Sequence, residues 1–461
     1  MFIGRQTELE KFNDRYNSSH AELIFLYGRR RIGKTEFLRK FSENKSQVLF
    51  FSATESNDYE QRERFKAKMI QGGYRGNPEL LNSWENIFRG MASLNANGKS
   101  LVIIDEFQYM FSGNKAIPSI LQNLWDEYLS KANIILILCG SAMSFIENEI
   151  LGSKNPLYGR GTAIFKMKEL SFYEARQFFP DYSVENQMRA YMILGGIPFY
   201  LKQFIGSKSI EYNIKMNILS PDTIMYNEID FLMKQELRET AIYNTIIAAI
   251  ALGNTQLNDI HQKTQIDKAK ITTYISNLID IHVVEREMSI SDKIKESANI
   301  QRGLYRISDN FFRFWYRYVY PNKSEIESGF DDCLFENTIE PDLNEFFGLG
   351  FEHIAEQYLW HQNKAGKLPI RFKKCGRFWA KGCEIDIIAI NKSEIIIGEC
   401  KWKNKPQGTE VYEALFAKSE RFNNYQCKYY FIFSKSGFMQ NLSTFAANNP
   451  NAFLVGINDM V

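Results

Sequence analysis

The chain has 461 residues, enough for roughly two to four domains of ordinary size. Hydrophobic residues make up 44% and charged residues 24% of it, which is typical of folded protein and argues against extended disorder. The formal net charge of +2 excludes a strongly basic protein, so any nucleic-acid surface has to be local.

Cysteine and histidine usage argues against metal knuckles and disulfide frameworks. The six cysteines form no CxxC pair, and the five histidines are scattered. Reduced thiols and a cytoplasmic location are therefore predicted. The first residues, MFIGRQTELEKF, lack an apolar core of signal-peptide length, and no apolar run reaches the ~20 residues that cross a bilayer, so no membrane association is expected.

Apolar runs alternate with helical patterns in residues 1–165. Runs at 22–27, 48–51, 101–105 and 134–140 are predicted as strands. Continuous apolar runs separated by helices indicate a parallel sheet that is buried on both faces. The pattern predicts an α/β multidomain protein that begins with a parallel-sheet core.

Residues 28–35 read GRRRIGKT and match G-x-x-x-x-G-K-[ST], with a predicted strand before and a helix after. In this loop the glycines let backbone amides face phosphates, the lysine reaches the β- and γ-phosphates, and the threonine binds Mg²⁺. The flanking strand and helix argue against a chance glycine turn. The three arginines either contact phosphate or a partner, or are solvated charge. The predicted nucleotide-binding residues are Gly28, Arg29, Arg30, Arg31, Ile32, Gly33, Lys34 and Thr35.

Acidic residues follow the third predicted strand in LVIIDEF at 101–107. Asp105 is expected to hold Mg²⁺ together with Thr35, and Glu106 to polarise the attacking water. Ser141, at the end of IILILCGS, is expected to sense the γ-phosphate. Ordinary strand-end polar residues are the alternative. ATP and Mg²⁺ are therefore the predicted cofactors of an ATPase.

Four blocks, FIGRQTELEKF, GRRRIGKT, LVIIDEFQ and CGSAMSFI, resemble the archaeal-type P-loop ATPases of the AAA+/STAND group over about residues 1–320. The resemblance implies an arginine that reaches the γ-phosphate, for which LYGRG offers Arg160. It also implies a Gly-x-Pro of a helical lid against the nucleotide, for which GGIPFYL offers Gly196 and Pro198. A surface arginine and a plain helix stop are the alternatives.

The rest of the chain divides into four expected parts. Residues 166–250 are predicted as a helical lid, and residues 251–321 as a winged helix. Its second helix offers Lys268 and Lys270 to DNA, unless the module only packs between domains. The aromatic stretch NFFRFWYRYVYP is expected to pack rather than to stack on bases. Polar residues 322–335 are expected as a linker before a final αβ unit, 336–461.

Two strands are expected in GCEIDIIAINKSEIIIGECKW, residues 382–402. Strand alternation puts Glu384 and Asp386 on one face, and Glu399 and Lys401 on one face of the next strand. Antiparallel pairing would bring Asp386 opposite Glu399. Two carboxylates on facing positions of neighbouring strands suit Mg²⁺ or Mn²⁺, and Lys401 would orient a metal-bound water.

This pattern resembles the PD-(D/E)xK nuclease motif, with Asp386 followed by Glu399-x-Lys401, in a restriction-endonuclease-like fold. The resemblance implies a further acid from the preceding helix, which FEHIAEQYL offers as Glu352, and the segment 310–430 resembles the domain often fused to archaeal-type ATPases. The first acid stands in Glu-Ile-Asp and not in the commoner Pro-Asp. Charged residues on a sheet edge, or a nuclease fold that only binds nucleic acid, are the alternatives.

The expected function is ATP hydrolysis coupled to nucleic-acid binding or cleavage, with DNA favoured over RNA. A protein partner or a homo-oligomer is also compatible with the sequence. The alternative is a non-catalytic nucleotide switch that regulates DNA or a protein partner.

Overall fold

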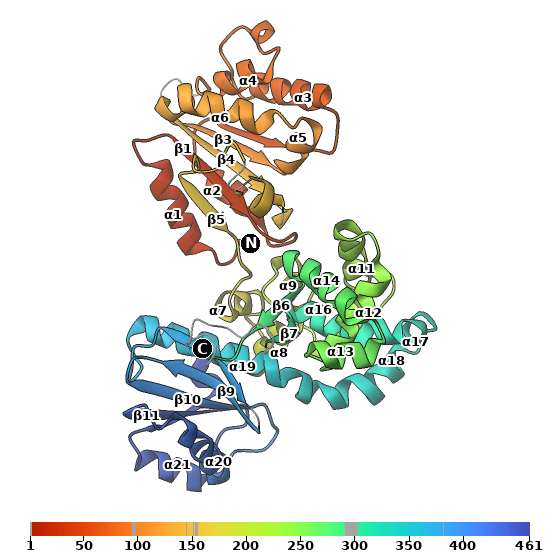
Figure 1. Ribbon diagram of the computed structural model, residues 1–461, viewed down its shortest axis with the longest axis vertical. Coiled ribbons are helices and arrows are strands. Elements are labelled where there is room, and N and C mark those ends of the chain that lie inside the picture. The colour runs from red at the N-terminus through yellow and green to blue at the C-terminus, as the bar shows by residue number, and fades with distance from the viewer. Residues whose placement is uncertain are drawn as a thin grey trace. The chain divides into compact units, whose positions relative to one another are not determined.

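The computed structural model describes residues 2–94, 98–143, 145–150, 152, 155–290, 303–380 and 382–461 (Figure 1). The chain forms two compact units. The N-terminal unit is Met1–Leu170 with Ile197–Phe199, and the C-terminal unit is Ser171–Gly196 with Tyr200–Val461. Within the described residues, no helix has the length and apolar character that spanning a membrane requires.

A five-stranded parallel sheet forms the centre of the N-terminal unit, in the order β2-β3-β4-β1-β5. The residues of β1, β3 and β4 are buried throughout, as continuous apolar runs require. The predicted parallel sheet is confirmed, and a short edge strand extends it. The strands are β1 (Glu22–Tyr27), β2 (Val48–Ser52), β3 (Ser100–Asp105), β4 (Ile134–Gly140) and β5 (Ala163–Lys166).

Helices cover both faces of this sheet. One face packs into a core with the helices that lie between β2 and β4. On the other face Phe12 of α1 contacts Phe37 of α2 at 4.9 Å and Phe165 of β5 at 4.5 Å between ring centroids. The helices are α1 (Gln6–Tyr16), α2 (Lys34–Ser42), α3 (Asp58–Gln71), α4 (Trp84–Met91), α5 (Gln108–Gly113) and α6 (Ile117–Glu127).

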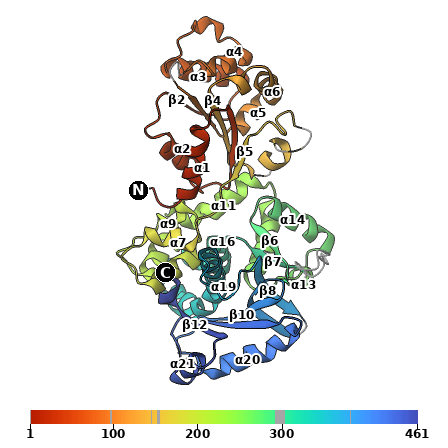
Figure 2. The same ribbon diagram turned by 90° about the vertical axis from the view of Figure 1, so that its left-hand side faces the viewer.

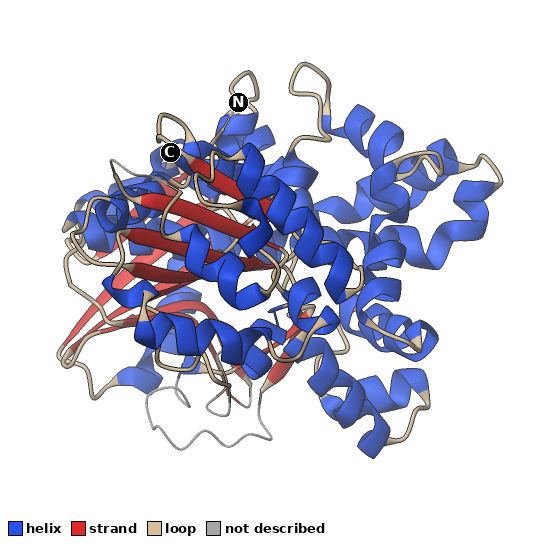
Figure 3. Ribbon diagram, turned by 90° about the horizontal axis from the view of Figure 1, so that it is seen from above, coloured by secondary structure: helices blue, strands red, loops and turns tan. Residues whose placement is uncertain are grey.

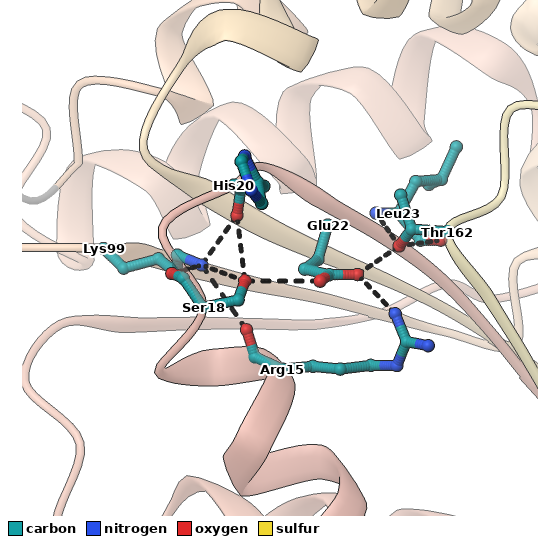
Figure 4. Close-up of polar contacts among 7 residues, drawn as sticks. All are labelled: Arg15, Ser18, His20, Glu22, Leu23, Lys99 and Thr162. Carbon is teal, nitrogen blue, oxygen red and sulfur yellow. Dashed lines mark hydrogen bonds and ion pairs between the residues drawn. The ribbon is translucent and has the colours of Figure 1, made fainter.

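A buried polar network closes the amino end of the sheet, where β1, β3 and β5 begin (Figure 4). The Lys99 ammonium donates to the carbonyl oxygen of Ser18 at 2.8 Å. The Glu22 carboxylate accepts from Arg15 at 2.8 Å, from the Ser18 hydroxyl at 3.2 Å, and from Thr162. Lys99 and Glu22 are both buried, and these contacts compensate the burial of their charges.

Helices build the first part of the C-terminal unit, as the sequence predicts. Figure 3 draws helices in blue and strands in red. The first helix of this part begins with a capping box, in which Ser171 and Glu174 bond each other's backbone. The helices are α7 (Phe172–Ala175), α8 (Val184–Leu194), α10 (Ile210–Asn213), α11 (Ile224–Glu236) and α12 (Thr240–Ala251). Helix α9 (Pro198–Leu201) is shared, because Pro198 and Phe199 belong to the N-terminal unit.

Two further helices precede a two-stranded antiparallel sheet. Helix α13 (Leu257–Thr264) is followed by α14 (Lys268–Asp280), whose first turn is capped by the Asp267 carboxylate. Strands β6 (Val284–Glu287) and β7 (Leu304–Ile307) then pair. The predicted order of two helices and two strands is present, and residues 291–302 between the strands lie outside the described part.

The aromatic stretch at 310–321 packs inside the C-terminal unit. It forms α16 (Asn310–Phe314) and one further turn, Trp315–Val319. Trp315 is fully buried, and its indole N–H donates to the carbonyl oxygen of Tyr226 at 2.8 Å. The expectation of packing rather than base stacking is confirmed.

Residues 322–335, expected as a linker, form α17 (Lys323–Glu327) and α18 (Asp331–Leu334). Ile326 and Leu334 are buried, so the polar residues of this stretch cover only its outer side. Apart from residues 166–170 and 197–199, the regions predicted as the lid, the winged helix and the C-terminal part lie in one compact unit.

A second, mixed sheet of five strands, β12-β11-β10-β9-β8, lies near the end of the chain. Strands β10, β11 and β12 are parallel, whereas β8 and β9 pair antiparallel. Helix α19 packs on one face and α20 on the other (Figure 2). The elements are α19 (Glu340–Ala365), β8 (Lys374–Ala380), β9 (Cys383–Ile390), β10 (Glu394–Lys401), α20 (Thr409–Ser419), β11 (Cys427–Ser434), α21 (Gln440–Ala447) and β12 (Ala452–Gly456).

Candidate functional site

The glycine-rich loop lies between β1 and α2 at the carboxyl end of the parallel sheet. Gly33 has φ +92°, a conformation that favours glycine, and it is the residue before α2. A side chain at Gly28 would meet the carbonyl oxygen of Met167 at 2.6 Å. Both glycines are therefore required by the path of this loop, and the start of α2 directs its N–H groups toward an anion.

Lys34 lies in the centre of the loop. Its ammonium donates to the carbonyl oxygens of Gly28 at 2.8 Å and Arg29 at 3.1 Å. Burial lowers the pKa of the Lys34 amine, while the neighbouring Cys139 and Glu106 act in the opposite direction. A buried cation at this position is suited to the phosphates of a nucleotide.

The two predicted Mg²⁺ ligands meet. The Thr35 hydroxyl donates to the Asp105 carboxylate at 2.7 Å. The other carboxylate oxygen of Asp105, which is 3% exposed, accepts the N–H of Glu106 at 3.1 Å. A hydroxyl and a carboxylate beside a phosphate-binding loop are oxygen donors of the kind that Mg²⁺ prefers, so these residues fit the ion.

Glu106 follows Asp105 in a left-handed backbone conformation, φ +55°. Its carboxylate accepts from the Ser141 hydroxyl at 2.7 Å and from the Ser141 N–H at 3.3 Å. Gln108 also donates to this carboxylate and lies 3.3 Å from the Ser141 hydroxyl. The Ser141 and Gln108 donors together fix the orientation of the Glu106 carboxylate. Gln108 was not predicted as a site residue, although its position two residues after Glu106 could have indicated a contact with that carboxylate.

The segment around Pro198 lies against the loop. A Cβ built on Gly33 would be 3.8 Å from Cγ of Pro198. The guanidinium of Arg31 stacks over the ring of Phe199 at 4.1 Å. Pro198 is thus beside the loop, as the resemblance implies, and Phe199 is a neighbour that was not predicted.

The other loop residues differ in their surroundings. Arg29 pairs with Glu169 at 3.8 Å, and the charge of Arg30 helps to lower the pKa of Lys34. Ile32 is buried and anchors the loop through packing.

Arg160 lies at the amino end of the parallel sheet, whereas the phosphate loop lies at its carboxyl end. It pairs with Asp126 at 3.0 Å and precedes β5. Close by, the N–H of Thr162 donates to the carbonyl oxygen of Leu23, near the amino end of β1, whereas the loop begins after the carboxyl end at Tyr27. The structure does not bring Arg160 to the phosphate loop of its own chain, because β5 runs parallel to β1 and its start lies at the far end.

The acids of the second sheet converge as strand alternation predicts. The register pairs Ile397 with Ile388 and Gly398 with Ile387, so one further step sets Glu399 opposite Asp386. The backbone N–H of Cys400 donates to the Asp386 carboxylate at 2.8 Å. Residues on facing positions of antiparallel strands share a face, so the two carboxylates lie on one side of the sheet.

Three cations surround these acids. Lys401 and Lys418 both donate to the Glu399 carboxylate, Lys418 at 3.0 Å. Arg377 pairs with Glu352 at 3.0 Å and also with Glu384. Arg377 and Lys418 were not predicted, because they reach the site from β8 and α20 through packing.

Glu352 and Asp386 interact through their charges. Burial and then the Asp386 charge raise the pKa of Glu352, and burial and then the Glu399 charge raise the pKa of Asp386. Two carboxylates on one side of a sheet suit a divalent cation, which Asp386 and Glu399 therefore fit. The described residues include no group of three or more His, Cys, Asp or Glu side chains arranged to hold a metal.

The paired strands β6 and β7 reach this site. Glu287 of β6 lies 3.7 Å from Arg377. The Ser289 hydroxyl accepts the N–H of Trp379 at 3.3 Å, and Ile290 is buried in the same core as Ile388. The strand after α14 is therefore anchored in the sheet that carries Asp386.

Comparison with known proteins identifies the N-terminal half. Residues 2–204 match the family described as "ATPase domain predominantly from Archaea", and residues 315–413 match "Archaea bacterial proteins of unknown function". The structure is similar to the Walker-type ATPase PABY2304 of Pyrococcus abyssi, with TM-score 0.53 and 19% identity. That similarity covers 68% of this chain and 96% of the other, and it shows a shared fold. The N-terminal unit is thus a P-loop ATPase domain that binds and hydrolyses ATP.

Relatives extend over nearly the whole chain. A short segment is 53% identical over 45 residues to the ATP-binding protein MJ0423 of Methanocaldococcus jannaschii, covering 10% of this chain and 76% of the relative. The protein MJECL04 of the same organism is 34% identical over 444 residues, which is 94% of this chain and 96% of the relative. The chain belongs to the family of MJECL04, whose similarity spans both the archaeal-type ATPase domain and the C-terminal region.

Proposed function

We propose that this ATPase couples its nucleotide state to nucleic-acid binding and metal-dependent cleavage by its C-terminal unit. The observation that carries the proposal is the pairing of β9 with β10, which sets Asp386 opposite Glu399 with Lys401 on the same strand. An ordinary solvated sheet edge does not account for a buried Glu399 and a partly buried Asp386 on two Ile-rich strands in the interior of the sheet.

In the ATPase domain, separate residues bind the phosphates, bind Mg²⁺ and activate the attacking water. Lys34 and the N–H groups at the start of α2 bind the phosphates, and Thr35 and Asp105 would hold Mg²⁺. Glu106, oriented by Ser141, accepts the proton of the attacking water.

The nuclease half uses the second sheet. Asp386 and Glu399 would hold a divalent ion, which when bound supplies a water of lowered pKa and neutralises charge on a phosphodiester. Lys401, anchored by Glu399, is placed to orient that water. Glu352 acts on Asp386 through its charge, and Arg377 holds it in place.

Helices α13 and α14 with β6 and β7 are assigned as a winged helix. Ile271, Ile275 and Leu278 face the interior of the unit. Lys268 and Lys270, at the start of α14, are exposed, which is the position from which a recognition helix contacts DNA. The contact between Glu287 and Arg377 gives this module a direct route to the acids of the sheet.

A non-catalytic nucleotide switch is the second candidate, and one observation favours it. Lys401 and Lys418 already pair with Glu399, and Arg377 already pairs with Glu352. Cations in these positions can replace a metal ion, and the sheet would then bind nucleic acid without cutting it.

Cleavage of supercoiled plasmid with Mg²⁺ or Mn²⁺, with and without ATP, separates the two candidates. Asp386→Asn is expected to lower the cleavage rate at least ~100-fold, because it removes one charged metal ligand. Glu394→Gln, at the other end of the same strand as Glu399, is the matched control and should cleave normally. Plasmid binding by the wild type without any cleavage would instead support the switch.

A further inference from the structure

A cavity of about 140 Å³ lies inside the C-terminal unit, between α12, β7, α16 and α19. It is separate from the acids of the second sheet and from the phosphate loop, none of whose residues line it. Gly253 and Glu345, which also line it, are exposed. Apolar side chains line part of it and three guanidinium groups line the rest: Ile250, Phe346 and Leu349 on one side, and Arg306, Arg313 and Arg317 on the other.

Arg313 is the unusual member of this set, because its side chain is buried and carries a charge. It is 8% exposed, and its guanidinium lies over the ring of Phe346 at 4.4 Å. One terminal nitrogen reaches the carbonyl oxygen of Phe346 at a long 3.5 Å. Its Nε has no hydrogen-bond partner among the described residues. A buried donor without a partner is costly, so proteins rarely keep one without a reason.

The acids around the cavity are already engaged by its other two arginines. Arg306 pairs with Glu287. Arg317 binds Asp342 through two nitrogens, at 2.7 and 2.8 Å, and reaches Glu345 at 3.3 Å. In the part of the chain that the structure describes, no carboxylate forms an ion pair with Arg313.

The charge on Arg313 persists at neutral pH. Burial and then the charge of Arg306 lower the pKa of Arg313 to about 10, while Tyr318 and Glu352 act in the opposite direction. Arg313 is therefore a buried cation without an ion-pair partner among the described residues, beside two guanidinium groups that already pair with acids. An anion that entered the cavity would compensate its burial.

We propose that this cavity binds a phosphate group, held by the guanidinium of Arg313 with Arg306 and Arg317 beside it. A guanidinium fork binds two phosphate oxygens at once, which suits Arg313, while Arg306 and Arg317 keep their acidic partners and add positive charge beside the phosphate. The apolar side formed by Ile250, Phe346 and Leu349 fits the sugar or base that a nucleotide phosphate carries. The phosphate belongs either to a free mononucleotide or to the 5′ end of a nucleic-acid strand.

This inference does not depend on cleavage by the second sheet. It places a phosphate at the junction of β7 with α16 and α19, in the same unit as the acids but on other residues. The rival explanation is purely structural: Arg313 stacks on Phe346 and serves packing alone.

The test uses the full-length chain with Lys34→Ala, which removes phosphate binding at the ATPase loop. Calorimetry measures the affinity for inorganic phosphate and for AMP. Fluorescence anisotropy compares a 5′-phosphorylated oligonucleotide with the same strand ending in a 5′-hydroxyl. Strand-end recognition gives a preference of about tenfold or more for the phosphorylated strand. Binding of AMP or phosphate without that preference assigns the cavity to a free anion.

Arg313→Met keeps the length of the side chain and removes the charge, so phosphate Kd should rise at least tenfold. Arg313→Lys keeps the charge but loses the fork and should bind with intermediate affinity. Arg189→Met, an arginine on α8 that pairs with Glu185, is the matched control and should not alter Kd.

A second variant keeps the test valid if the core does not tolerate Arg313→Met. Leu349→Trp, at a partly exposed position of the lining, narrows the cavity and leaves Arg313 in place. It should weaken phosphate binding as well. The inference is overturned if the Lys34→Ala chain binds no phosphate, or if neither Arg313→Met nor Leu349→Trp changes the phosphate Kd.

Discussion

Replacing Glu106 by glutamine should separate ATP binding from ATP hydrolysis. The carboxylate accepts from the hydroxyl and the N–H of Ser141, at 2.7 and 3.3 Å, and from Gln108. Glutamine retains one acceptor oxygen at the same position, so it can keep the bonds from Ser141. It loses the negative charge that accepts a proton from water.

The size of the effect follows from that single lost function. General-base assistance is worth about 10²- to 10⁴-fold in rate, or ~3–5 kcal/mol at ~1.4 kcal/mol per factor of ten. The folded state loses at most one hydrogen bond to Gln108, worth ~0.5–1.5 kcal/mol, which leaves a domain of ordinary stability folded. The Glu106→Gln protein should therefore bind ATP like the wild type and hydrolyse it at least ~100 times more slowly.

Phosphate release under saturating ATP gives kcat, and calorimetry gives the affinity for ATP. Glu127→Gln, an exposed change at the end of α6, is the control and should leave both unchanged. An unchanged kcat in Glu106→Gln would show that another residue activates the water. A collapse of ATP affinity would show that Glu106 shapes the loop and does not act in hydrolysis.

Other substitutions test other parts of the molecule. Lys34→Ala should abolish ATP binding in calorimetry, because the loop loses the buried ammonium at its centre; wild-type affinity would contradict the loop assignment. Replacing Lys268 and Lys270 together with alanine should lower the slope of log Kd against log salt by ~1.8, at ~0.9 per phosphate contact. An unaltered slope would make α14 a packing helix. Lys99→Met removes an ammonium that donates to the carbonyl oxygens of Ser18 and His20, both at 2.8 Å. Urea unfolding should show a loss of ~2–4 kcal/mol in the N-terminal unit with kcat unchanged, whereas an unchanged midpoint would refute a stabilising role.

Patterns that depend on neighbouring strands could be predicted from the sequence. Strands β1, β3 and β4 of the first sheet are buried on both faces, so their apolar runs were sufficient. The pairing of Asp386 with Glu399 followed from alternation along two consecutive strands. Strand β5 was missed because it is a four-residue edge strand whose residues alternate between partly buried and exposed.

Contacts between distant segments could not be predicted. Arg160 comes near the end of the ATPase core in sequence, but the parallel pairing of β5 with β1 decides whether it lies at the amino or the carboxyl end of the sheet. Arg377 and Lys418 meet the acids because β8 and α20 pack against β9 and β10, and no spacing in the sequence carries that information. Residues 322–335 read as a linker because most of them are polar, whereas Ile326 and Leu334 anchor them as helices.

Coupling between nucleotide state and nucleic-acid affinity is the central claim. Fluorescence anisotropy of a labelled DNA duplex with the Glu106→Gln protein, with ATP–Mg²⁺ and without nucleotide, tests it most directly. The account predicts that duplex Kd differs at least ~5-fold between the two states, and that saturating DNA changes ATP affinity by the same factor, since coupling between two sites is reciprocal. Equal duplex Kd values in the two states would contradict it.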